Sequence, residues 1–336
     1  MSERAERIQA FLARAGWGDV PRRPLAGDAS FRRYDRLEAP GRRAVMMDAP
    51  PPHEDVRPFL SVARLLHKLD LSAPEILAED VDAGLLLLED FGDRTYTKLL
   101  ADGGDEAALY RLAVDVQIAL HRRFEPALGA SLPPYNESRL LTEASLLVDW
   151  YLPAVSGAPT SPEVREEYLA MWRALLPLAA AIPATLVLRD YHVDNLMLLE
   201  GRTGLAACGL LDFQDAVIGS PAYDLVSLLE DARRDVTPDL SSALLEHYLV
   251  AFPNIDRAAF ETAAAVLATQ RNCKILGIFT RLCVRDRKPQ YLAHTPRLWR
   301  LLARDVSHPA LAPARRWLDR HLPAELRRIP LPEAAS

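Results

Sequence analysis

The chain has 336 residues, with 40 Lys and Arg against 46 Asp and Glu, which gives a net charge of −6 at pH 7. This length suffices for two lobes with separate cores. The acidic balance argues against a general nucleic-acid-binding protein, and no apolar stretch reaches the roughly 20 residues of a membrane span. The charged N-terminus and three widely spaced cysteines predict a cytoplasmic protein with free thiols. We also expect a monomer with neither a membrane nor a nucleic-acid partner.

The first 90 residues are predicted to be mainly sheet. Apolar spacing indicates a short helix over 3–15 and a second helix over 55–69. Alternating patterns and turn residues predict an antiparallel meander, followed by two more short strands. The expected strands cover residues 31–37, 43–48, 75–79 and 85–89.

The pattern changes after Gly92, where helical periodicity dominates. A β-hairpin near residues 186–212 interrupts the helices. We therefore expect an N-terminal nucleotide-binding lobe over 1–91 and a C-terminal catalytic and substrate-binding lobe over 92–336, with the ligand site in the cleft between them. The expected helices cover residues 105–123, 141–152, 162–181, 222–232, 239–251, 257–270 and 272–284.

Three polar residues in the hairpin region fit the chemistry of phosphoryl transfer. Asp190 and Asn195 stand five positions apart in a polar loop, and Asp212 ends an apolar run 17 residues later. A carboxylate at Asp190 can orient an attacking hydroxyl and accept its proton, while an amide oxygen and a second carboxylate can hold Mg²⁺ against ATP phosphates. We expect Asp190 to be catalytic, and Asn195 and Asp212 to bind the metal.

These residues resemble the catalytic and metal-binding segments of the protein-kinase-like superfamily. Asp190, His192 and Asn195 match the loop of the aminoglycoside phosphotransferase-like kinase family, although Leu188 and Arg189 replace its usual His-Gly pair. The resemblance implies an α+β, bilobal protein-kinase-like fold with a small β-rich N-lobe and a larger helical C-lobe. It also implies that ATP and Mg²⁺ are the cofactors, and that Asp224 has a structural role beside the catalytic loop.

Within that family, the chain is most similar to kinases of cell-wall recycling that act on N-acetylmuramate and N-acetylglucosamine. The similarity implies phosphorylation of the anomeric hydroxyl, which gives an amino-sugar 1-phosphate for peptidoglycan recycling. For such a sugar, the candidate substrate residues are His192 and Asp194, which flank the catalytic loop, and Arg271 and Lys274, which recur at helical spacing. The segments that carry the similarity are residues 27–34, 47–51, 88–93 and 189–196.

The nucleotide is expected to contact two parts of the chain. The first is the turn between the first two strands, and the second is the segment that joins the lobes. Backbone amides in a tight turn can face phosphate oxygens. Protein kinases place a lysine on the third strand, but residues 43–48 contain none. Either an arginine substitutes for it (Arg32, Arg33 or Arg43), or the metal and the loop amides suffice, and Glu54 has no evident ion-pair role. The candidate nucleotide-binding residues are Gly27, Asp28, Ala29, Ser30, Phe31, Arg32, Glu89 and Phe91.

Two other functions remain open from the sequence. The first is a kinase of another small acceptor, such as an aminoglycoside, choline or a homoserine-like alcohol. The second is a nucleotide-binding pseudokinase with a regulatory role, which the missing strand lysine suggests. Retention of Asp190, Asn195 and Asp212 argues against the pseudokinase, since inactive kinases commonly lose one such residue.

Overall fold

The computed structural model describes residues 3–25 and 31–330, and the chain divides into two compact units. The first unit contains the chain up to Val116 together with Val193–Ala216, and the second contains Gln117–His192 together with the chain from Val217 onward. The predicted lobe boundary after Phe91 stays a prediction.

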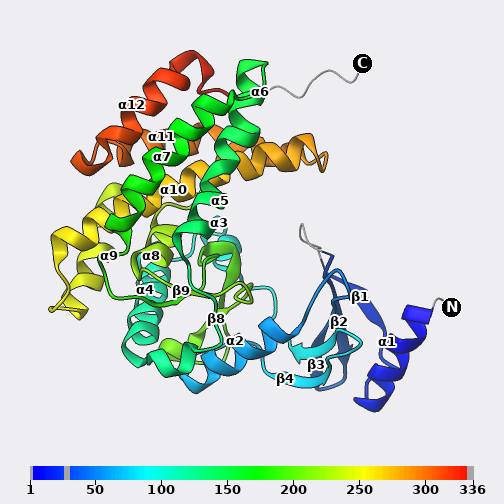
Figure 1. Ribbon diagram of the computed structural model, residues 1–336. Helices are drawn as coiled ribbons and strands as arrows, with labels where there is room; N and C mark the ends of the chain where they lie inside the picture. Colours follow the sequence, from blue (N-terminus) through cyan, green and yellow to red (C-terminus); the bar gives the residue numbers. More distant parts are fainter. Residues whose placement is uncertain (1–2, 26–30, 331–336) are drawn as a thin grey trace. The chain divides into compact units, whose positions relative to one another are not determined.

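The first unit is built on a five-stranded antiparallel sheet with the order β1-β2-β3-β5-β4. Helix α1 (Glu3–Arg14) buries Ile8, Phe11 and Leu12 against it, and Leu37 and Met46 of the sheet belong to the same core (Figure 1). The predicted antiparallel meander is thereby confirmed. The strands are β1 (Arg22–Pro24), β2 (Arg33–Ala39), β3 (Arg42–Asp48), β4 (Ile76–Asp80) and β5 (Leu85–Glu89).

Three helices and a hairpin complete this unit. Thr95 caps α3 by accepting a hydrogen bond from the backbone N–H of Lys98. A 3₁₀ turn, Val193–Asn195, leads directly into the hairpin. The helices are α2 (Arg57–Lys68), α3 (Tyr96–Ala101) and α4 (Glu106–Arg123), the last of which continues into the second unit, and the hairpin strands are β7 (Leu196–Leu198) and β8 (Cys208–Leu210).

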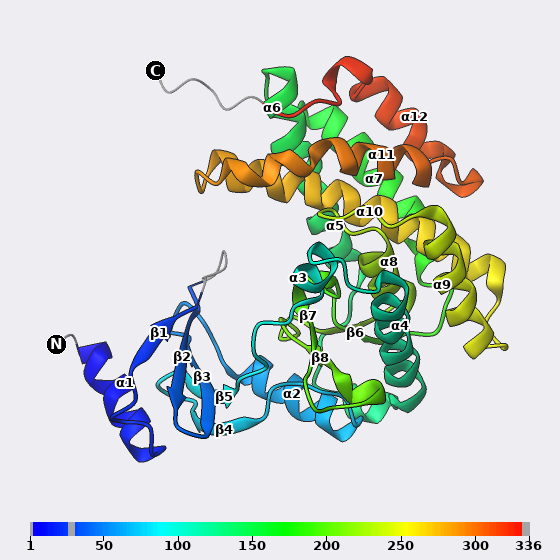
Figure 2. The ribbon, with the colours of Figure 1, turned by 180° about the vertical axis from the view of Figure 1, so that it is seen from behind.

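The second unit is organised around one long helix, α10 (Arg257–Val284) (Figure 2). Helices α5, α7, α8 and α11 all pack against it. In the described residues, no helix is both long and apolar enough to cross a membrane. The remaining elements are α5 (Glu137–Leu146), α6 (Leu152–Ser156), α7 (Pro162–Ala179), β6 (Thr185–Val187), β9 (Val217–Gly219), α8 (Ala222–Leu229), α9 (Pro238–Ala251), α11 (Thr295–Asp305) and α12 (Ala312–His321).

Three details of the predicted secondary structure were wrong. Residues 257–270 and 272–284 form one helix, because Arg271 is an ordinary helix residue with no glycine or proline beside it. The helix expected over 141–152 begins at Glu137, where Asn136 caps it, and passes into a π-helical turn at Leu147–Tyr151. The hairpin predicted over 186–212 is shorter than expected: it consists of β7 and β8, and β6 pairs with β9 instead.

Gly277 is required where α10 meets α5. A Cβ atom at this position would lie 2.3 Å from the backbone carbon and oxygen of Leu146, far inside van der Waals contact. Gly277→Ala should therefore destabilise the protein by about 2 kcal/mol, although alanine favours a helix by about 1 kcal/mol over glycine. Urea denaturation measures this change, and an unchanged midpoint would contradict the close packing of the two helices.

Candidate active site

Asn195 and Asp212 lie at the same end of the β7–β8 hairpin. The register pairs Leu196 with Leu210, and the backbone N–H of Leu211 donates to the carbonyl of Asn195 at 3.0 Å. Asp212 adopts a left-handed backbone conformation, with φ of +56°. Its neighbour Phe213 is buried against Phe59 of α2, with ring centroids 4.9 Å apart. The buried Phe213 ring thus fixes the segment that carries Asp212.

The donor set of this pair fits Mg²⁺. Amide and carboxylate oxygens are the ligands that this ion prefers, and it keeps water in its remaining positions. Across residues 3–25 and 31–330, no group of three or more His, Cys, Asp and Glu side chains could hold a metal ion. A site with two protein ligands therefore suits magnesium better than a structural zinc, which takes four.

Arg32 lies near two carboxylates, those of Glu54 and Asp212. Its Nε lies 3.8 Å from Glu54 Oε2, and its Nη2 lies 3.6 Å from Asp212 Oδ1. The backbone N–H of Phe31 also donates to Glu54 Oε1 at 3.1 Å. The expectation that Glu54 has no ion-pair role was therefore wrong. Arg33 and Arg43 are exposed, which leaves Arg32 as the best substitute for the strand lysine.

The remaining predicted phosphate-binding residues, Gly27, Asp28, Ala29 and Ser30, lie outside the described residues. The two predicted hinge residues are held in place by the hairpin segment. Arg202 pairs with the Glu89 carboxylate and stacks over the ring of Phe91 at 5.6 Å. Gly209 also lies against that ring, because a Cβ atom there would be 2.8 Å from it. Phe91 is thus packed on one side by β8.

Arg36, which the sequence analysis did not single out, fixes the backbone just after β5. This arginine on β2 is 4% exposed, and it donates to Asp90 Oδ1 at 3.0 Å, to the carbonyl of Gly92 at 3.0 Å and to Asp93 Oδ1 at 2.8 Å. Burial opposes its charge, but the hydrogen bond to Asp93 and the charge of Asp90 raise the pKa of Arg36. The segment that would contact a nucleotide base is therefore rigidly held.

In the second unit, Asp224 fixes the loop that presents Asp190. Its carboxylate accepts from the backbone N–H of Leu188 at 2.6 Å and from that of Arg189 at 2.8 Å. Burial raises the pKa of Asp224 to about 7, against the effect of these two amide donors. Arg189 adopts a left-handed backbone conformation with φ of +70°, and Ser227 Oγ donates to its carbonyl at 3.3 Å.

Asp190 is ionised at neutral pH. Burial works against its charge, but Lys274, His192 and Arg189 together lower the pKa of its carboxyl group. Burial and the charge of Arg233 in turn lower the pKa of His192, so its imidazole is neutral near pH 7. The loop therefore presents a carboxylate base beside a neutral histidine.

The predicted substrate residues divide between the two units. His192, Arg271 and Lys274 belong to the second unit, where His192 and Arg271 are buried. Asp194 belongs to the first unit, where Thr97 of α3 donates its hydroxyl to the Asp194 carboxylate.

Glu143 on α5 is the buried counter-ion of this region. Its carboxylate pairs with Arg189 and accepts from the hydroxyl of Tyr135, and it lies 3.1 Å from Lys274 Nζ. Burial opposes ionisation, but Lys274 and Arg189 lower the pKa of Glu143 below its usual value. No sequence pattern identifies Glu143, because its partners come from distant segments of the chain.

Glu143→Gln should destabilise the protein by about 3 kcal/mol at pH 7, because it leaves Arg189 and Lys274 without their buried carboxylate. The pKa of Glu143 is lower in the folded than in the unfolded chain, so its stabilisation exists above the unfolded pKa and disappears as the pH falls through the folded pKa. Urea denaturation from pH 7 down to pH 3 should show the free energies of unfolding of the wild type and the variant converging. A difference in this free energy that stays constant with pH would contradict the ion pairs of Glu143.

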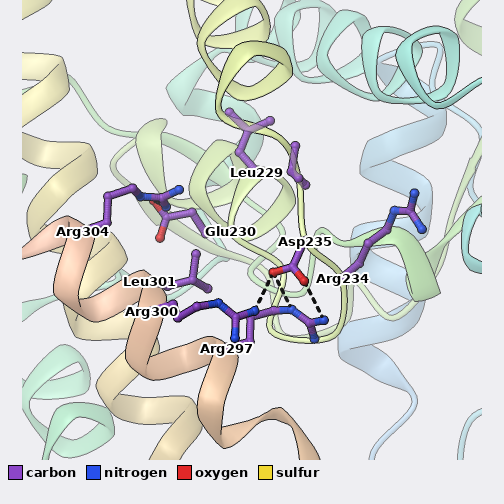
Figure 3. A pocket seen from close by; sticks show the side chains of 9 residues that line it. Leu229, Glu230, Arg234, Asp235, Arg297, Arg300, Leu301 and Arg304 are labelled. Carbon is purple, nitrogen blue, oxygen red and sulfur yellow. Dashed lines mark hydrogen bonds and ion pairs between the residues drawn. The ribbon is translucent and has the colours of Figure 1, made fainter. Parts of the chain in front are cut away.

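A small cavity of about 140 Å³ lies between α11 and the chain that follows α8 (Figure 3). Three of its arginines, Arg297, Arg300 and Arg304, are paired with carboxylates. Arg297 holds both carboxylate oxygens of Asp235 at 2.9 and 3.0 Å, and Arg300 donates to Asp235 at 3.1 Å. Arg304 lies 2.6 Å from Glu230. These ion pairs join α11 to the segment around Asp235, so the cavity belongs to the scaffold.

The chain is similar in sequence to known phosphotransferases and kinases. Residues 21–261 match the model of the phosphotransferase enzyme family. A protein of Caulobacter vibrioides named N-acetylmuramate/N-acetylglucosamine kinase is 39% identical, covering 97% of this chain and 99% of its own length. A protein of the same name from Pseudomonas aeruginosa is also 39% identical, covering 90% of each chain.

Solved structures show the same fold at low sequence identity. The ADP-bound aminoglycoside phosphotransferase APH(2'')-Ib superposes with a TM-score of 0.60 at 16% identity, over 90% of this chain and 98% of that one. A choline/ethanolamine kinase family protein from Mesorhizobium loti also gives 0.60 at 16% identity, over 96% and 99% of the two chains. The predicted kinase-like fold is thereby confirmed.

Proposed function

The chain belongs to the phosphotransferase enzyme family, and we propose that it is an ATP-dependent kinase of N-acetylmuramate and N-acetylglucosamine. The phosphoryl group is transferred to the anomeric hydroxyl, and the product is the sugar 1-phosphate. Such a product suits a cytoplasmic step of peptidoglycan recycling that feeds nucleotide-sugar synthesis. The observation that carries the proposal is the loop of Asp190, whose preceding backbone amides donate to the Asp224 carboxylate.

Asp190 orients the acceptor hydroxyl and takes its proton during attack on the γ-phosphate. Its lowered pKa keeps it ready to accept a hydrogen bond, and makes it a weak base. A weak base suffices for an anomeric hydroxyl, because the ring oxygen makes this hydroxyl more acidic than that of an ordinary alcohol. Asp224 contributes by fixing the backbone amides just before Asp190.

Asn195 and Asp212 are the residues that would hold Mg²⁺, which when bound supplies charge neutralisation at the phosphates. Arg32, oriented by Glu54, is positioned to bind phosphate oxygens in the role of the strand lysine. Backbone groups of Glu89 and Phe91 are proposed to contact the adenine.

The alternative acceptors and the pseudokinase are less well supported. The two named relatives cover nearly the whole chain at 39% identity, whereas the aminoglycoside and choline kinases match it at 16%. Arg32 removes the main reason for a pseudokinase, since it supplies a cation paired with Glu54.

Measuring ADP release with Mg-ATP and a panel of acceptors tests the proposal. We expect turnover with N-acetylmuramate and N-acetylglucosamine, and ADP at background with choline, homoserine and kanamycin. Turnover with one of the latter compounds alone would reassign the substrate. ATP binding without turnover of any acceptor would favour the pseudokinase.

A further inference from the structure

The middle of α10 is polar on every side and yet buried. We call residues 269–274 the polar girdle of this helix. Burying polar and charged groups is unfavourable unless each finds a partner, so such a segment indicates a site rather than a core. Its polar members and their exposed fractions are Thr269 (0%), Gln270 (0%), Arg271 (4%), Asn272 (1%) and Lys274 (9%).

Most side chains of the polar girdle have protein partners. Thr269 Oγ1 donates to the carbonyl of Ala265 at 2.9 Å, and Gln270 Nε2 donates to the carbonyl of Leu140 at 3.0 Å. Asn272 donates to Asp305 at 2.9 Å and to Glu230 at 3.2 Å. These contacts join α10 to α5, α8 and α11, and they account for the buried donors of these three residues as parts of the scaffold.

Lys274 is also accounted for. It lies 3.1 Å from the Glu143 carboxylate and donates to the hydroxyl of Tyr223 at 3.4 Å. Because Glu143 already neutralises it within the protein, Lys274 is poorly placed to provide charge for a ligand.

Arg271 differs from the other donors of the polar girdle. Its Nη1 is buried and has no hydrogen-bond partner in the protein; the other buried atoms of the girdle without a partner are two acceptors, the amide oxygens of Gln270 and Asn272. The guanidinium lies close enough to the Asp190 loop for its charge to lower the pKa of Asp190 and of His192. A buried guanidinium edge that lacks a partner costs free energy comparable to a lost charged hydrogen bond. A ligand acceptor atom at this edge would satisfy it.

The local charge specifies the class of ligand. Arg189 and Lys274 are both paired with the Glu143 carboxylate, whereas no carboxylate among the described residues forms an ion pair with Arg271. This unpaired guanidinium favours an acceptor with an anionic group over a polycation such as an aminoglycoside. Arginine binds carboxylates through paired N–H donors, which makes a carboxylate the natural partner.

We propose that Arg271 determines specificity by binding a carboxylate of the acceptor. This inference rests on the proposed function. N-acetylmuramate carries a lactyl ether with a carboxylate, and N-acetylglucosamine has a hydroxyl in its place. Arg271 therefore favours the first sugar over the second, while Lys274 acts through Glu143 to position the Asp190 loop.

The test compares kcat/KM for the two sugars in the wild type and in Arg271→Gln. We expect the variant to lose about 100-fold with N-acetylmuramate, as when one partner of a buried charge pair is removed, and less than about 3-fold with N-acetylglucosamine. Arg271→Lys keeps the charge but lacks the paired donors, so its kcat/KM with N-acetylmuramate should lie between those of the wild type and of Arg271→Gln. Arg281→Gln is the matched control, because Arg281 also lies on α10 and also has a buried nitrogen, Nε, without a partner, and it should change neither value.

A second measurement changes the sugar and leaves the protein intact. The methyl ester of N-acetylmuramate should react with the wild type as poorly as N-acetylglucosamine does, and calorimetry should show the same loss in its binding. Equal losses with both sugars in Arg271→Gln and Arg271→Lys would overturn the inference and make Arg271 a support of the loop. The inference would also be overturned if the methyl ester reacted and bound as well as N-acetylmuramate itself. A wild type inactive with both sugars would instead refute the proposed function itself.

Discussion

Asp190→Asn should reduce kcat by roughly 10²–10⁴-fold, the range of a lost general base. Asparagine keeps the size of the side chain but cannot accept a proton, so the loss belongs to the transition state and the KM for ATP should change little. Steady-state kinetics with saturating N-acetylglucosamine measures kcat, and calorimetry with a non-hydrolysable ATP analogue and Mg²⁺ measures nucleotide binding.

The control for this variant is Asp239→Asn, which removes an exposed carboxylate in the same unit, at the start of α9. It should leave both kcat and the affinity for nucleotide unchanged. Turnover near that of the wild type in Asp190→Asn would show that Asp190 is not the base. Loss of nucleotide affinity together with kcat would indicate instead that the change disturbs the loop.

Asp212→Asn should have an effect of similar size on turnover but a different signature. Loss of a metal-binding carboxylate removes several kcal/mol of charge stabilisation, or about 10³-fold in kcat/KM. It should also weaken binding of the Mg-nucleotide, which Asp190→Asn does not. Titrating Mg²⁺ at fixed ATP analogue measures this directly, and higher magnesium should recover part of the binding.

Asp102→Asn serves as the control here, because Asp102 is an exposed carboxylate just after α3 in the same unit. The side chain of Asp212 also accepts a hydrogen bond from Gln214 at 2.8 Å, which asparagine can still accept through its oxygen. Unchanged dependence on magnesium in Asp212→Asn would therefore contradict its role as a metal ligand.

Local patterns predicted much of the fold and the centre of the candidate site. Residues 85–89 indicate a buried strand because the first four are all leucine, and these four leucines are buried in β5, an inner strand of the sheet. Asp190 and Asn195 stood out by their spacing in a polar loop, and Asp212 stood out because it ends an apolar run. The resemblance then supplied a role for Asp224, and its carboxylate does bind the two amides before Asp190.

What escaped the sequence depends on contacts between distant segments. Glu143 gains its importance from Arg189 and Lys274, and Arg36 gains its importance from Asp90 and Asp93. An isolated charged residue on a helix or strand usually faces solvent, so no local pattern separates these two from the many others. The sequence also left Arg271 outside the two helices predicted over 257–270 and 272–284, which form the single helix α10.

Phosphorus NMR of the reaction of Mg-ATP with N-acetylmuramate and with N-acetylglucosamine tests the central claim most directly. The proposed function predicts ADP and a new phosphate signal coupled to the anomeric proton of each sugar, and both should disappear with Asp190→Asn. A phosphate on any other hydroxyl, or no sugar phosphate at all, would contradict the proposed anomeric kinase.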